Sequence, residues 1–220
     1  MSIEATFGQA NHSLTIIGQQ EPTAEHLRVL HDGYLADLVR AIKLGTIPAR
    51  YEFQKFLGLA PDFHVWCTIK LGTGLRTAGE FGIALKQAGC RIGDWGSDIL
   101  GKPAFTASRV ETEVDLVALS VAELGFKDGA TRKDIYERAI EIGLELCPAE
   151  VGPQLRLQYK DQPNGERLLV AMNPIADSGG GLNVFNVERS DHDLWLSARS
   201  GRPDYFGHSG SRWVFRLPRK

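Results

Sequence analysis

The chain of 220 residues lacks the features of several common protein classes. It has only three cysteines and no C-x-x-C pair, which argues against a disulfide framework and against a thiolate zinc site. No apolar run is long enough to cross a bilayer, and the N-terminus has no signal-peptide pattern. The net charge is −2 and the pI is about 6.3, so no charge excess points to nucleic acid or to disorder. We therefore expect a cytoplasmic protein with no membrane segment.

The first part of the chain, residues 1–60, favours helices. Apolar residues follow helical spacing from Leu27 to Ile42, and Gly45 ends that helix. A second short helix is expected to start at Pro48, because proline suits the first turn of a helix. The pattern predicts a helical N-terminal region over residues 1–60.

Two strand–helix units are predicted at about 61–150. Aromatic and β-branched residues indicate strands at 63–69 and at 114–121. Each strand is followed by a helix N-cap signal, Thr77 in the first unit and Thr131 in the second, and later by a helix-ending glycine. Equivalent positions are 54 residues apart. An internal duplication is one interpretation, and two independent helices with good caps are the other.

The remaining segment, at about 151–220, favours strands. Leu155, Leu157 and Tyr159 alternate with polar residues, which predicts a half-solvated strand. Further strand candidates, each bounded by turn residues, lie at 168–172, 182–187, 194–198 and 213–217. This pattern predicts a C-terminal antiparallel β-meander, and the chain as a whole is assigned to the α+β class, with residues 61–220 as its α+β domain.

Candidate catalytic residues are few. Glu150 and Gln154 stand in a segment rich in proline and glycine, 147–154, which we interpret as a stiff loop between a helix and a strand. One alternative for function is a small hydrolase-like enzyme that pairs His64 with a carboxylate such as Glu150. His64 and Cys67 point to opposite faces of their predicted strand, so they cannot form a nucleophilic pair within it.

Two other motifs resemble ligand sites and fit them poorly. The glycine-rich turn at 72–79 lacks the third glycine of a dinucleotide-binding fingerprint, and a flexible turn explains it. The run Asp191-His192-Asp193 holds metal-ligand residue types, but adjacent residues on a turn rarely converge on one ion. We predict a hairpin turn there, and no metal or cofactor.

Basic and aromatic residues are interleaved in the C-terminal segment 195–220, whose local charge is +5. This composition is typical of single-strand nucleic-acid surfaces, and the candidate ligand-binding residues are Trp195, Arg199, Arg202 and Arg216. The other interpretation is a strand that packs its aromatic residues inward and leaves its arginines in water.

The runs 124–131 and 144–159 resemble a group of uncharacterised bacterial proteins, and the resemblance extends from Trp66 to the C-terminal Arg-Lys. It implies a bacterial or phage-related origin and supplies no catalytic residues. The leading hypothesis is a non-enzymatic binding or interaction protein, with a protein partner as one option. The hydrolase and the nucleic-acid binder remain the alternatives.

Overall fold

The computed structural model describes residues 15, 17, 19–48, 50–59 and 61–218. The chain divides into two compact units, Met1–Pro48 and Ala49–Lys220. Both helices and strands are present, which confirms the α+β class. Across the described residues, no helix has the length and apolar character needed to cross a membrane.

Over residues 24–43, the first unit forms the consecutive helical segments α2 (Ala24–Val29), η1 (Leu30–Tyr34) and α3 (Leu35–Lys43). Thr23 caps α2, since its side chain accepts a hydrogen bond from the backbone N–H of His26. The predicted single helix is interrupted at Gly33, whose φ of 106° is outside the helical region. None of the residues in these three segments is buried.

The second unit begins with α4 (Arg50–Phe56), the predicted second short helix. Tyr51 is only 2% exposed, its hydroxyl accepts a hydrogen bond from the backbone N–H of Phe63 at 2.8 Å, and the two rings stack. This packing explains why the division between the units falls before α4, whereas we predicted a boundary after residue 60.

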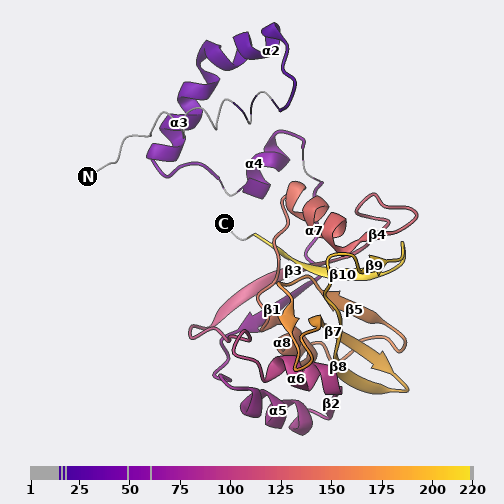
Figure 1. The fold of residues 1–220 in the computed structure, drawn as a ribbon. Helices are drawn as coiled ribbons and strands as arrows, with labels where there is room; N and C mark the ends of the chain where they lie inside the picture. Colours follow the sequence, from indigo (N-terminus) through magenta and orange to yellow (C-terminus); the bar gives the residue numbers. More distant parts are fainter. Residues whose placement is uncertain (1–14, 16, 18, 49, 60, 219–220) are drawn as a thin grey trace. The chain divides into compact units, whose positions relative to one another are not determined.

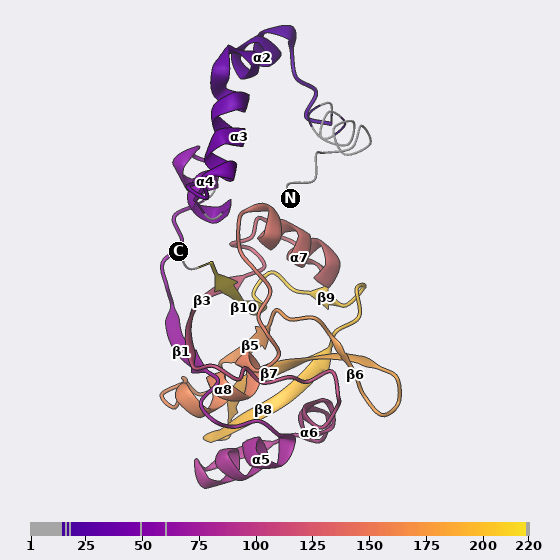
Figure 2. The same ribbon diagram turned by 90° about the vertical axis from the view of Figure 1, so that its left-hand side faces the viewer.

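A curled mixed sheet forms the body of the second unit (Figures 1 and 2). In spatial order its strands are β1 (Cys67–Leu71), β3 (Thr112–Ser120), β10 (Arg212–Leu217), β5 (Arg167–Val170), β7 (Leu182–Ser190), β8 (Asp193–Ser200) and β2 (Cys90–Ile92). The short β6 (Ile175–Ala176) pairs with β7, while β4 (Ala130–Thr131) and β9 (Phe206–Gly207) form a separate pair.

The predicted C-terminal meander is not confirmed. Strands β5, β7 and β8 are antiparallel neighbours, but β10 lies on the other side of β5, parallel to it and antiparallel to β3. Trp213, Val214 and Phe215 are all fully buried, so β10 needs cover on both faces. A strand with two buried faces is stable only inside a sheet, and a meander would have left β10 at the edge.

Four helices complete the unit: α5 (Ala78–Gln87), α6 (Asp94–Leu100), α7 (Arg132–Glu141) and α8 (Val151–Gln158). The predicted caps of α5 and α7 are confirmed, because Thr77 and Thr131 each accept a hydrogen bond from the backbone N–H three residues later. The 54-residue offset relates these two helices along their whole length. It does not relate the strands, since the position 54 residues after Leu71 lies beyond Ser120, where β3 ends. The duplication therefore stays a hypothesis for the helices alone.

The strand predicted at 155–160 is wrong, because residues 151–158 form α8. Gln154 and Arg156 were expected to face water, but they are only 1% and 0% exposed. The alternation of polar and apolar residues in this segment therefore did not indicate a side exposed to solvent. Pro153 is tolerated because it occupies the first turn, where its missing N–H has no helical partner to lose.

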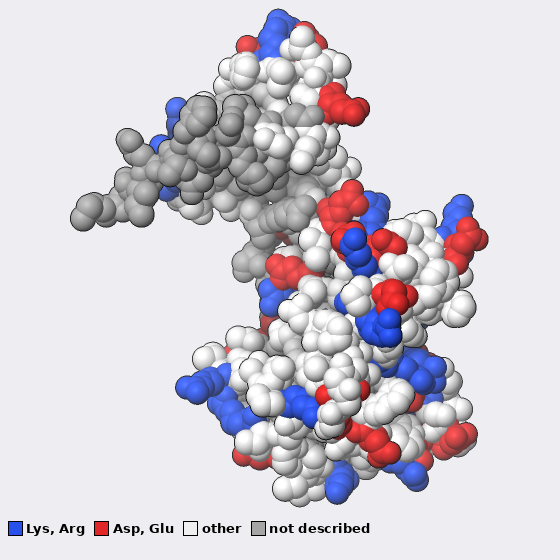
Figure 3. Space-filling model, viewed as in Figure 1, with Lys and Arg blue, Asp and Glu red and all other residues white. Residues whose placement is uncertain are grey.

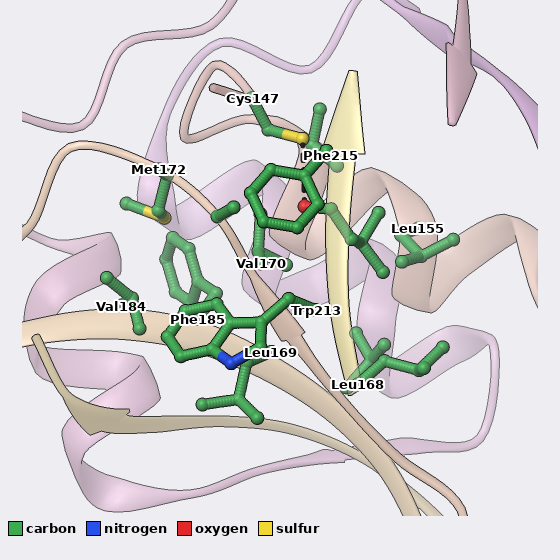
Figure 4. Close-up of a cluster of buried hydrophobic side chains, with 14 of the residues drawn as sticks. Cys147, Leu155, Leu168, Leu169, Val170, Met172, Val184, Phe185, Trp213 and Phe215 are labelled. Atoms are coloured by element: carbon green, nitrogen blue, oxygen red, sulfur yellow. Dashed lines mark hydrogen bonds between the residues drawn. The ribbon is translucent and has the colours of Figure 1, made fainter. Parts of the chain in front are cut away.

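The core has two parts. One lies between α8 and one face of the sheet, and the other lies between α7 and the opposite face. Figure 4 shows Phe215 close to Cys147, whose thiol donates to the carbonyl of Val214 at 3.4 Å, and Phe185, Leu169 and Trp213 belong to the same buried cluster. Burial raises the pKa of the Cys147 thiol. Cys90 is buried as well, so both cysteines act as small core residues.

The free edge of β1 is covered by one side chain of α8. The Gln158 amide donates to the carbonyl of Lys70 at 2.8 Å and accepts from the Lys70 N–H at 2.9 Å. At Lys70 these two bonds reproduce the pattern of a neighbouring strand, so the last residue of α8 caps the sheet edge at this position.

Gly152 tests the packing of α8 on the sheet. A Cβ at this position would lie 2.6 Å from the ring of Phe185. We expect Gly152→Ala to lower the free energy of unfolding by about 1–3 kcal/mol, because the core has no room for the methyl group. Urea denaturation of the full chain measures the change.

The matched control is Gly82→Ala in α5, where an added Cβ meets nothing within 4 Å. Alanine should be neutral there or stabilise by up to about 1 kcal/mol. Equal effects of the two substitutions would contradict the packing described for α8.

Candidate functional site

Glu150 serves as a buried structural acceptor. It is 1% exposed, and its two carboxylate oxygens accept hydrogen bonds from the backbone N–H of Gly72 at 2.8 Å and of Ser108 at 2.7 Å. The side-chain amide of Gln154 adds a third bond at 3.2 Å. The expected stiff loop is in fact the entry to α8, with Glu150 as the residue that precedes the helix.

The structure does not bring His64 and Glu150 together. His64 is exposed and precedes β1, whereas Glu150 contacts Gly72, which follows the other end of that strand. A five-residue strand is about 16 Å long. The proposed hydrolase pair therefore gains no support from the geometry.

The four predicted ligand-binding residues are also separated. Arg202 forms an ion pair with Asp204, and Arg216 forms one with Glu145. Arg216 lies in β10, three strands away from β8, which carries Trp195 and Arg199. Only Trp195 and Arg199 share an element, and as residues i and i+4 of one strand they point to the same sheet face.

Arg199 lies in the wall of a cleft of about 560 Å³ on that face. Its lining residues come from α6, β5, β8 and the segment that leads into β10: Trp95, Arg167, Leu169, Arg199, Ser200, Tyr205, His208, Gly210, Ser211 and Arg212. We call it the Arg199 cleft. Its volume is in the range of pockets that hold small molecules.

The strand register defines the floor of the Arg199 cleft. Arg167 of β5 pairs with Glu188 of β7, and Leu169 pairs with Asn186. Directly paired residues of antiparallel strands project to the same side. Glu188 and Asn186 therefore lie on the sheet face that carries the lining residues Arg167 and Leu169.

Glu188 holds the two arginines of the cleft. Its side chain is 14% exposed, Arg167 Nε donates to Glu188 Oε2, and Arg199 Nη2 lies 3.9 Å from the same oxygen. One carboxylate thus serves two guanidinium groups. The remaining N–H donors of both arginines are left for another acceptor, and the floor keeps a net positive charge.

Polar atoms without partners mark the same face. Asn186 is 0% exposed, and within the described part of the chain neither its amide nitrogen nor its amide oxygen has a hydrogen-bond partner. Arg199 Nε is buried and unpaired in the same way. More than nine in ten buried polar groups normally find a partner. Arg199 lines the cleft, so its unpaired Nε points to a place where a polar ligand or water binds, whereas Asn186 lies beneath the lining residues.

Two aromatic residues flank the cleft. Trp95 is 59% exposed near the start of α6, which lies close to β8: a Cβ on Gly96 would be 2.9 Å from the carbonyl of Leu196. Tyr205 also lines the cleft, in the segment between β8 and β9, and its carbonyl accepts the backbone N–H of Arg132 at 2.7 Å. The backbone that carries each of these rings therefore lies against a neighbouring element.

Elsewhere the charges are mixed. On the face that Figure 3 shows, basic and acidic side chains are interspersed over the second unit. Among the residues with a described position, no group of three or more His, Cys, Asp or Glu side chains is arranged to hold a metal ion. The residues Asp191 and His192 have φ values of 50° and 68° and form the two-residue turn between β7 and β8, which confirms the predicted hairpin.

Comparisons with known proteins add no further constraint. No protein-family model, no curated protein and no solved structure matches this chain.

The sequence reasoning found Arg199 and Trp195 but missed Arg167, Glu188 and Trp95. These residues are separated by up to about a hundred positions and meet only through strand order. One signal was present: Asn186 interrupts an otherwise apolar run within β7 and has no partner in any local turn pattern.

Removing the Glu150 carboxylate tests its structural role. We expect Glu150→Ala to cost about 3 kcal/mol of folding free energy, because it leaves the buried N–H of Gly72 and the partly buried N–H of Ser108 without acceptors. His64→Ala should change stability by less than about 0.5 kcal/mol, since the residue is exposed. Thermal or urea unfolding of both variants checks this. A Glu150→Ala protein as stable as the unaltered one would show that the carboxylate does not stabilise the fold through these hydrogen bonds.

Proposed function

We propose that this protein binds a small anionic molecule that carries a planar ring, and that the Arg199 cleft is the binding site. One observation carries the proposal: Arg167 and Arg199 lie together with unpaired buried polar atoms on one face of the sheet. The part of that face covered by α7 is apolar. The proposal agrees with the sequence-based hypothesis of a binding protein and names a site for it.

The anion is expected at Arg167 and Arg199. A guanidinium group presents several N–H donors in a plane, which match a carboxylate or a phosphate in a bidentate manner. Glu188 fixes Arg167 through Nε, so the two terminal nitrogens remain directed away from that bond. Fixing the guanidinium in advance lowers the entropic cost of binding.

The ring is expected between Trp95 and Tyr205. An exposed indole at the rim of a cleft offers a large flat surface, and aromatic pairs gain about 0.5–1.5 kcal/mol beyond the area they bury. The half-buried Tyr205, which also lines the cleft, supplies a second aromatic surface. A ligand with an anionic group and a ring would use both parts of the cleft.

Calorimetric titration with phenyl phosphate tests the proposal. This probe contains both features, and we expect it to bind more tightly than inorganic phosphate or phenol alone. Arg199→Ala should weaken its binding by about tenfold or more, because a hydrogen bond to a charged group contributes about 1.5–3 kcal/mol.

The matched control is Arg202→Ala. Arg202 is an exposed arginine paired with Asp204, and it does not line the cleft. Its loss should leave the affinity for phenyl phosphate unchanged within about twofold. Equal losses of affinity in the two variants would show that only general charge attraction is measured, and they would overturn the proposal. The absence of binding at millimolar concentrations of phenyl phosphate would overturn it as well.

A further inference from the structure

A row of polar and aromatic side chains continues from the Arg199 cleft to the edge of the sheet. Arg167 of β5 pairs with Glu188 of β7, Glu188 pairs with Trp195 of β8, and Trp195 pairs with Arg91 of β2. The register places all four on the same sheet face. Arg167 belongs to the cleft lining, so the row and the cleft form one continuous surface.

Trp195 and Arg91 provide a stacking surface outside the cleft. The Arg91 guanidinium carbon lies 5.4 Å from the centre of the Trp195 ring, and its Nε lies 2.9 Å from Asp193. The Arg91 side chain is 59% exposed, so it is accessible to a ligand. Aromatic rings and guanidinium planes are the groups on which unpaired nucleobases stack.

The spacing of the row fits a ligand longer than one ring. Neighbouring strands are about 4.8 Å apart, so Trp195 lies about 10 Å from Arg167 across two strand spacings. Along β8, the four residue steps from Trp195 to Arg199 span about 13 Å. A ligand with one anionic group and one ring would fill the cleft without reaching Trp195. A ligand that also contacts Trp195 and Arg91 would need a second anionic group and a second ring. A repeating chain of phosphates and bases has that composition.

We propose that the ligand of the Arg199 cleft is single-stranded nucleic acid, with one nucleotide in the cleft and the next one stacked on Trp195 beside Arg91. This inference rests on the proposed function of the cleft and names its ligand class. Three arginines face the chain of phosphates, while Glu188 and Asp193 offset part of their charge. Binding is therefore weak and moderately salt-dependent, with stacking as the larger contribution.

Fluorescence anisotropy with a labelled oligothymidylate of ten nucleotides tests the inference on the full chain. We expect the oligomer to bind about tenfold or more tightly than thymidine 5′-monophosphate. Trp195→Ala should weaken oligomer binding by about 5- to 100-fold, the effect of losing one stacked base. The same variant should leave phenyl phosphate binding in the cleft unchanged. The logarithm of the affinity should fall with the logarithm of salt with a slope of about −2, as expected for three phosphate contacts.

The control variant is Tyr34→Ala, which removes an exposed ring, 69% accessible, from the first unit. It should bind the oligomer like the unaltered protein. Phenyl phosphate binding without tighter oligomer binding would overturn the nucleic-acid inference and leave the cleft proposal standing. Equal binding of a duplex of the same length, or an unaffected Trp195→Ala variant, would also overturn it. If neither probe binds, both proposals fail.

Discussion

The buried carboxylate of Glu150 and the polar helix that follows it are the constraint on which the second unit depends. Burying α8 requires that its polar side chains find partners, since an unpaired buried group is costly. Glu150 satisfies this by holding the backbone at Gly72 and Ser108. Arg156 donates to Gln162, whose amide in turn donates to the carbonyl of Val187 in β7. The strand that carries the cleft floor is thus fixed from beneath by α8.

Much of the local structure could be predicted because its causes are local. The caps at Thr77 and Thr131 depend on four adjacent residues, and the turn at Asp191-His192 depends on two. Helix α8 could not be predicted from the alternation around Leu155, because a helix buried on nearly all sides shows no solvent face. The place of β10 was equally hidden, since it is determined by pairing with distant β3 and β5.

The candidate site shows the same limit more strongly. Composition pointed to Trp195 and Arg199, which lie on one strand, but it also pointed to Arg202 and Arg216, which are engaged in ion pairs. What distinguishes these arginines is the neighbouring acid. Asp204 and Glu145 each serve a single arginine, whereas Glu188 is shared between Arg167 and Arg199. That distribution depends on strand register, which a single sequence does not reveal.

The two outer strands of the sheet differ in what they can still bind. At β1 the amide of Gln158 occupies both backbone groups of Lys70, so an extended peptide from another molecule cannot pair with this residue. Such blocking protects a sheet from edge-to-edge aggregation during synthesis and storage at high concentration. A single glutamine thereby performs for this fold what lysines, prolines or bulges do on the edges of other sheets. Loss of the Gln158 side chain would therefore lower the solubility of the protein before it changed other properties.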